Sequence, residues 1–151
     1  FPMITQESEV RHLRRECERI RKELQEENLP AGSFEFGIMI ETPAAALITD
    51  QLAKEVDFFS VGTNDLTQYT LAIDRQNAEL SGQFDPHHPA LLQLLSLIAQ
   101  NARKEGIWAG ICGELAADTA LTEKFLDWGY EELSVSPASV LKLRKVICNL
   151  N

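Results

Sequence analysis

The chain has 151 residues, with 14 Lys and Arg against 23 Asp and Glu for a formal net charge of −9, and 44% of its residues are hydrophobic. This composition is typical of one folded domain, so disordered and collagen-like chains are excluded. Nucleic acids and anionic membrane surfaces bind clustered positive charge, which an acidic chain of this kind lacks. We therefore expect no nucleic-acid partner.

Membrane insertion is not expected either. No apolar run approaches the ~20 residues of a bilayer span, and residues 1–4 (FPMI) lack a signal-peptide pattern. These observations predict a cytoplasmic location. The three cysteines, Cys17, Cys112 and Cys148, are too few and too widely spaced for a disulfide framework or a C-x-x-C motif, so we expect free thiols.

The first predicted element is an amphipathic helix over residues 6–27. Apolar residues recur there at spacings of three and four, at Val10, Leu13, Cys17, Ile20 and Leu24. This spacing places them on one helix face. It is also compatible with a coiled-coil seam, but the pattern stops at residues 27–32, which favours a helix that docks on a sheet.

Strands and helices alternate along the rest of the chain. Strands are predicted at residues 34–40, 56–62, 107–112 and 132–135, and helices at residues 42–55, 63–71, 89–105, 118–128 and 137–148. Thr42 with Pro43 is a typical helix start, and Thr63-Asn64-Asp65 is expected to cap the next helix. Cys148, in the last helix, is expected to pack. The alternation predicts a parallel sheet with right-handed crossovers.

The length limits the architecture. About five strand–helix units account for the whole chain, whereas a closed (β/α)8 barrel takes about 250 residues. Two architectures remain open at this point: a small open α/β domain, or about five eighths of a barrel.

Polar side chains follow three of the predicted strands, at Glu41, at Asn64-Asp65 and at Cys112-Gly113-Glu114. In parallel α/β folds the carboxyl ends of the strands meet at one edge, where functional sites are built. Glu41 and Asp65 together are able to ligate Mg²⁺. Each is also explained as an acid favoured by a helix N-terminus.

The remaining candidates allow two interpretations each. Cys112 is either a buried structural thiol or a thiol that faces the site and donates a proton. Arg75 opens the polar, turn-rich segment 74–89, which predicts a long functional or mobile loop. The guanidinium of Arg75 either binds a phosphate or forms an ion pair with a nearby acid at the surface. His87 and His88 are interpreted as loop and capping residues.

Three sequence segments carry a family resemblance: Gly37–Ala46 (GIMIETPAAA), Asp57–Arg75 (DFFSVGTNDLTQYTLAIDR) and Gly110–Ala116 (GICGELA). They resemble the phosphoenolpyruvate-binding domain of the phosphoenolpyruvate-protein phosphotransferases, enzyme I of the bacterial sugar phosphotransferase system. The resemblance covers residues 1–151. Pyruvate phosphate dikinase and phosphoenolpyruvate synthase share GTNDLTQ and CGE, but the continuation Tyr69–Arg75 favours the phosphotransferases.

The resemblance implies a partial (β/α)8 TIM barrel, of which this chain forms about five C-terminal strand–helix units. It also implies a role for each candidate residue. Glu41 and Asp65 resemble the Mg²⁺ ligands, and Asn64 and Arg75 resemble contacts to the phosphoryl group of phosphoenolpyruvate. Cys112 resembles the acid that protonates C3 of the enolate.

The same resemblance implies transfer of the phosphoryl group to an enzyme histidine and then to the phosphocarrier protein HPr, in sugar uptake by a homodimer. The acceptor histidine and further substrate arginines of the family are not among these residues, so we expect the chain alone to be inactive. An alternative for the isolated chain is a non-catalytic dimerisation module, because five barrel strands leave unpaired edges and an uncovered face.

Overall fold

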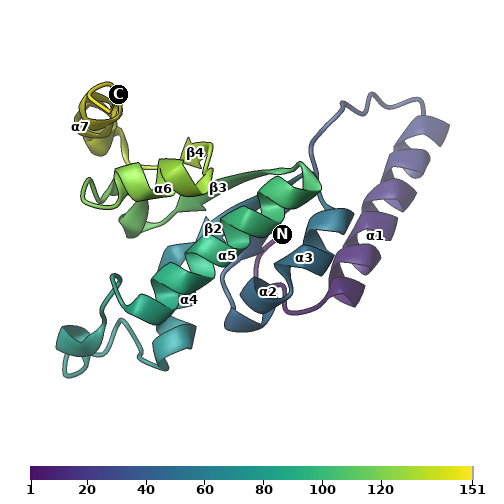
Figure 1. Ribbon diagram of the computed structural model, residues 1–151. Coiled ribbons are helices and arrows are strands. Elements are labelled where there is room, and N and C mark those ends of the chain that lie inside the picture. Colours follow the sequence, from purple (N-terminus) through teal and green to yellow (C-terminus); the bar gives the residue numbers. More distant parts are fainter. Residues whose placement is uncertain (151) are drawn as a thin grey trace.

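The computed structural model describes residues 1–150, and its centre is a four-stranded sheet with the order β1-β2-β3-β4 (Figure 1). The strands are β1 (Gly37–Ile40), β2 (Phe58–Gly62), β3 (Trp108–Cys112) and β4 (Glu132–Leu133). All three neighbouring pairs are parallel. The expected α/β class with a parallel sheet is therefore confirmed.

Helices connect successive strands. They are α1 (Glu7–Glu26), α2 (Pro43–Leu47), α3 (Thr49–Leu52), α4 (Thr63–Leu71), α5 (Pro89–Glu105), α6 (Thr122–Trp128) and α7 (Pro137–Ile147), with short 3-10 turns η1 (Ala53–Glu55), η2 (Ser81–Gln83) and η3 (Glu114–Ala117). Helix α5 is central, since it contacts β2, β3 and the helices α2, α3, α4 and α6 (Figure 1). No helix within residues 1–150 has the length and apolar character needed to cross a bilayer.

The first residue extends the sheet beyond β1. The amino group of Phe1 donates a hydrogen bond to the Gly37 carbonyl at 2.9 Å, and the Met39 N–H donates to the Phe1 carbonyl at 2.8 Å. Phe1 thus bonds to the residue before Ile38 and to the residue after it. Two parallel strands are hydrogen-bonded in this way. Phe1 therefore pairs with β1 in the manner of a fifth parallel strand, at the edge of the sheet.

The sheet has two unlike faces. Alternate residues of each strand point to opposite sides, and one set is buried under the helices. This helix-covered face includes Ile38, Ile40, Phe59, Val61 and Ile111, all 1% exposed or less. The other set forms what we call the open face, on which Met39, Phe58, Ser60, Trp108 and Cys112 are only partly buried.

Two predicted helices differ from those in the structure. The predicted helix 42–55 is interrupted at Ile48, which has φ −111° and ψ 21°. There the buried Thr49 hydroxyl donates to the Ala46 carbonyl and accepts a hydrogen bond from Asn101 of α5. The predicted helix 118–128 begins only at Thr122, because the Asp118 side chain accepts a hydrogen bond from the Ala120 N–H and forms a turn.

The first helix does not dock on the sheet as expected. Helix α1 packs against α3 and η1, at one side of the molecule (Figure 1). Val10 is its only fully buried residue, whereas Ile20 is 47% exposed. Cys17 packs against the core as predicted, but Cys148 is exposed, so the prediction that it packs was wrong.

Candidate functional site

The parallel register brings the polar strand ends together. Ile40 pairs with Val61, and Gly62 pairs with Cys112. Glu41 directly follows Ile40, so it comes next to Gly62 in the same row across the sheet. The carboxyl ends of β1, β2 and β3 thus form one rim.

Glu41 lies in a pocket that its neighbours shape. The side chain is 4% exposed, and its Oε1 accepts a hydrogen bond of 2.7 Å from the Met3 N–H. A Cβ atom on Gly62 would lie 2.7 Å from Glu41 Oε2. Only glycine at position 62 leaves room for this carboxylate.

Asp65 and Arg75 form an ion pair. Asp65 lies in the first turn of α4, and its Oδ1 is 3.5 Å from Nη2 of Arg75. The chain turns back after α4 because Ala72 adopts a left-handed conformation, and the Arg75 N–H then donates to Gln68 Oε1. The pairing of Arg75 with a nearby acid is therefore present, while its role as a phosphate clamp stays a prediction.

The loops after β2 and β3 are joined by side-chain hydrogen bonds. The Thr63 hydroxyl donates to the Cys112 carbonyl at 2.9 Å, and Asn64 Oδ1 accepts from the Glu114 N–H at 3.3 Å. Gly113, with φ 97°, allows this approach, because a Cβ there would lie 2.6 Å from Thr63 Oγ1. The predicted capping by Thr63-Asn64-Asp65 was wrong: Gly62 is the N-cap residue and no side chain caps the helix. The side chains of Thr63 and Asn64 bond to Cys112 and Glu114 instead, and Asp65 pairs with Arg75.

Cys112 is held from the strand next to it. Its Sγ donates to the Val61 carbonyl at 3.4 Å, and the Ser60 hydroxyl donates to Sγ at 3.5 Å. The side chain is partly exposed on the open face. This position differs from that of a fully buried structural thiol.

A cavity of about 360 Å³ opens at the rim and is lined by Asn64, Arg75, Phe84 and Glu114. A second cavity of about 270 Å³ shares three of these residues, Asn64, Phe84 and Glu114. Phe84 belongs to the polar segment 74–89. The segment that was expected to be functional or mobile therefore lines the same cavity as the predicted site residue Asn64.

An ion pair that the sequence analysis missed ties this segment down. Nε2 of His87 lies 2.5 Å from Oδ2 of Asp118. Partial burial raises the pKa of the Asp118 carboxyl, but hydrogen bonds from the Ala120 N–H and His87 outweigh it and hold the pKa below its usual value. The two residues are 31 positions apart, so local spacing gave no signal. His88 caps α5 as predicted, since its side chain accepts from the Ala90 N–H.

The rim supplies carboxylates in the number that magnesium requires. Among the residues that the structure describes, no three His, Cys, Asp or Glu side chains come close enough to hold a metal by themselves. Mg²⁺ is usually bound by one or two carboxylates, with substrate oxygens and waters as the other ligands. The oxygen donors Glu41 and Asp65 fit that chemistry.

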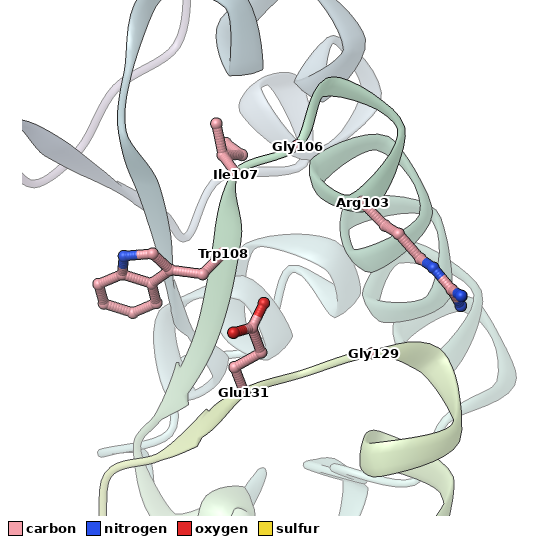
Figure 2. Close-up of a pocket in the computed structure, with 6 residues that line it drawn as sticks. All are labelled: Arg103, Gly106, Ile107, Trp108, Gly129 and Glu131. Carbon is pink, nitrogen blue, oxygen red and sulfur yellow. The ribbon is translucent and has the colours of Figure 1, made fainter.

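A larger cavity lies at the other end of the strands. It has a volume of about 670 Å³ and is lined by Arg103, Gly106, Ile107, Trp108, Gly129 and Glu131. Figure 2 shows Arg103 and Trp108 on opposite sides of β3. In parallel α/β folds chemistry is built at the carboxyl ends of strands, so we assign the site to the smaller cavities at the rim.

Comparison with known proteins identifies the family of the chain. A family model described as "PEP-utilising enzyme, PEP-binding domain" matches residues 1–151. The phosphoenolpyruvate-protein phosphotransferase of Haemophilus influenzae is 47% identical over 100% of this chain and 26% of that protein. The Lactococcus lactis protein of the same name is 43% identical with the same coverage. The chain thus spans about a quarter of the length of these relatives.

The fold also has a solved counterpart. The crystal structure of a citrate lyase from Burkholderia xenovorans LB400 superposes with a TM-score of 0.65 at 20% sequence identity. The superposition covers 97% of this chain and 47% of the lyase chain. At this identity the similarity concerns the fold alone, and it supports the partial barrel.

Proposed function

Because the chain belongs to the PEP-utilising enzymes, as their PEP-binding domain, we propose that it binds phosphoenolpyruvate within a Mg²⁺-dependent phosphotransferase. The full-length enzyme passes the phosphoryl group to its own histidine, which lies outside this chain, and then to HPr. This transfer serves sugar uptake in the cytoplasm. The names of the relatives favour this proposal over a dikinase or a synthase.

Each site residue receives a role in the proposal. Glu41 and Asp65 hold Mg²⁺, which neutralises charge on the substrate oxygens when it is bound. Asn64 and Arg75 bind the phosphoryl group, for which Arg75 exchanges its contact with Asp65. Loss of the phosphoryl group leaves an enolate, and Cys112 protonates its C3 carbon.

The environment of Glu41 is the observation that carries the proposal. This carboxylate is buried, and no Lys or Arg within residues 1–150 forms an ion pair with it. A buried carboxylate without a countercharge is costly. A bound divalent cation removes that cost, and Asp65 at the same rim provides a second ligand.

Calorimetric titration of the full-length enzyme with phosphoenolpyruvate and Mg²⁺ tests the metal site. We expect Glu41→Ala and Asp65→Ala to abolish metal-dependent binding. Glu26→Ala removes an exposed carboxylate from the end of α1 and serves as the control, with binding unchanged. Undiminished binding in both site variants would contradict the metal assignment.

Turnover of Cys112→Ser tests the proton donor. We expect this variant to bind phosphoenolpyruvate normally and to lose turnover, whereas Cys148→Ser, at an exposed thiol, stays active. Full activity of Cys112→Ser would remove the acid role. Phosphotransfer to HPr by the 151-residue chain alone would contradict the proposal that this chain supplies only the substrate-binding part.

A second candidate function is homodimerisation, favoured by an exposed apolar surface on α1 and the segment after it. Ile20, Leu29 and Phe34 are 47%, 48% and 60% exposed, and Ile20 and Phe34 line an apolar cavity of about 280 Å³. Exposed patches of this kind mark interaction sites. We expect a dimer mass by light scattering that Phe34→Ser lowers and Leu141→Ser, at an exposed residue of α7, does not. A monomeric wild type at tens of micromolar would exclude this function.

A further inference from the structure

Ser60 lies beside Cys112 on the open face of the sheet. In the register, Ser60 pairs with Gly110, and Cys112 lies two residues beyond Gly110 on the same strand face. The Ser60 hydroxyl donates to Cys112 Sγ at 3.5 Å, while Sγ itself donates to the Val61 carbonyl at 3.4 Å. In this arrangement Sγ both donates and accepts a hydrogen bond.

Two glutamates lie beside glycines near this thiol in the sheet. Glu132 of β4 lies over Gly110, where a Cβ would be 3.0 Å from the Glu132 Cβ, and Glu41 lies over Gly62, the register partner of Cys112. Within residues 1–150, no Lys or Arg has a hydrogen bond to Sγ, and the Ser60 hydroxyl is its one side-chain donor. The Ser60 hydroxyl is therefore placed to donate a hydrogen bond to a negative charge on this sulfur.

We propose that Ser60 is a positioning residue for Cys112, whose hydroxyl orients the thiol and stabilises the thiolate left after proton transfer. The inference rests on the proposed role of Cys112 as acid. In that step the S–H bond breaks and its proton forms a C–H bond at C3 with the π electrons of the enolate. The enolate oxygen becomes a carbonyl oxygen, and the negative charge passes to sulfur, where the Ser60 O–H donates to it.

The test compares Ser60→Ala and Ser60→Thr in the full-length enzyme. Ser96→Ala, which removes a hydroxyl from α5 that contacts Gln100, is the matched control. The first readout is the rate of Cys112 alkylation by iodoacetamide as a function of pH, measured by peptide mass spectrometry so that Cys17 and Cys148 are counted separately. The second is kcat and KM for phosphoenolpyruvate.

We expect Ser60→Ala to slow Cys112 alkylation at neutral pH by about tenfold, the effect of one hydrogen bond on the thiolate. We expect kcat to fall by a similar factor, with KM unchanged. Ser60→Thr retains a hydroxyl and should restore both rates, and Ser96→Ala should alter neither. Loss of activity through misfolding would lower the melting temperature and would not be rescued by threonine.

The inference is overturned if Ser60→Ala alkylates and turns over at the wild-type rate while Cys112→Ser is inactive. In that case the proposed function stands and only the role of Ser60 is wrong. If Cys112→Ser is itself fully active, Cys112 is not the proton donor, and the role of Ser60 falls with it. Slow alkylation in Ser60→Ala with normal turnover likewise overturns the catalytic part of the inference.

Discussion

The two faces of the sheet use alternate residues of the same strands for different purposes. On β2, Phe59 and Val61 are fully buried against the helices, whereas Phe58 and Ser60 face the open side and are partly exposed. On β3 the same alternation separates Ile111 from Cys112. The helix-covered face thus holds the fully buried side chains, whereas the open face also carries polar and reactive side chains such as Ser60 and Cys112.

The comparison is tested most strongly by two adjacent phenylalanines. Phe59→Ala leaves a cavity in the core and should lower the free energy of unfolding by about 3–5 kcal/mol. Phe58→Ala, on the open face, loses a half-buried ring stacked on Trp108 at 4.3 Å, so about 1–2 kcal/mol is expected. Urea unfolding of both variants measures the difference. Equal losses would show that the two faces do not differ in this way.

A second prediction concerns the space kept for Glu41. In Gly62→Ala the new methyl group meets both Oε2 and Cβ of Glu41, so the carboxylate has to move and the free energy of unfolding should fall by about 1–3 kcal/mol. Metal-dependent substrate binding should be lost as well. Gly32→Ala is the matched control, because nothing lies within 4 Å of its Cβ. Equal stability of the two variants in urea unfolding would contradict this account.

A third prediction is that removal of the charge of Glu41 affects stability and metal binding in opposite directions. Glu41→Gln keeps an oxygen for the Met3 N–H but removes the buried negative charge. Without Mg²⁺ we expect this variant to gain about 1 kcal/mol in unfolding free energy, as is common when a functional group that opposes stability is replaced. Calorimetry should show at the same time that Mg²⁺ no longer supports phosphoenolpyruvate binding. A loss of stability would mean that the charge is compensated within the protein.

The smallest expected effect concerns the ion pair between His87 and Asp118, which belongs to neither face. The pKa of Asp118 is lowered in the folded protein, so its stabilisation is present above the ordinary pKa of an aspartate and is lost as the pH falls through the folded value. The pair is partly exposed, so less than about 1 kcal/mol is expected. Melting curves of wild type and Asp118→Asn should differ at pH 7 and converge in acid. A difference that persists in acid would exclude the ion pair as its cause.

The sequence predicted the bounds of an element well where residues that start or stop a helix stand at both of its ends. The helix from Pro89 to Glu105 has the predicted bounds, because proline begins it and Gly106 ends it with a left-handed conformation. The rim also followed from the sequence, since parallel strands end at one edge. The residue pattern left two interpretations each for Glu41 and Cys112; the family resemblance favoured metal binding and proton donation, and both roles stay predictions.

Contacts between distant segments could not be predicted. The break at Ile48 depends on the hydrogen bond from Asn101 to Thr49, across 52 positions. Thr63 looked like a helix cap, but in the structure its hydroxyl binds the Cys112 carbonyl instead. In each case the deciding partner is a residue about 50 positions away, which no local sequence pattern contains.

The stacked pair of Phe58 and Trp108 gives the open face an optical signal of its own. The chain has two tryptophans: Trp108 stacks on Phe58 and donates to Glu35, whereas Trp128 lies in α6 beside Phe125. Replacing either one with phenylalanine yields a chain with a single tryptophan, which can be excited selectively over the two tyrosines and lies on a known side of the sheet. Emission from Trp108 would then follow events at the open face, and emission from Trp128 would report on the helical layer.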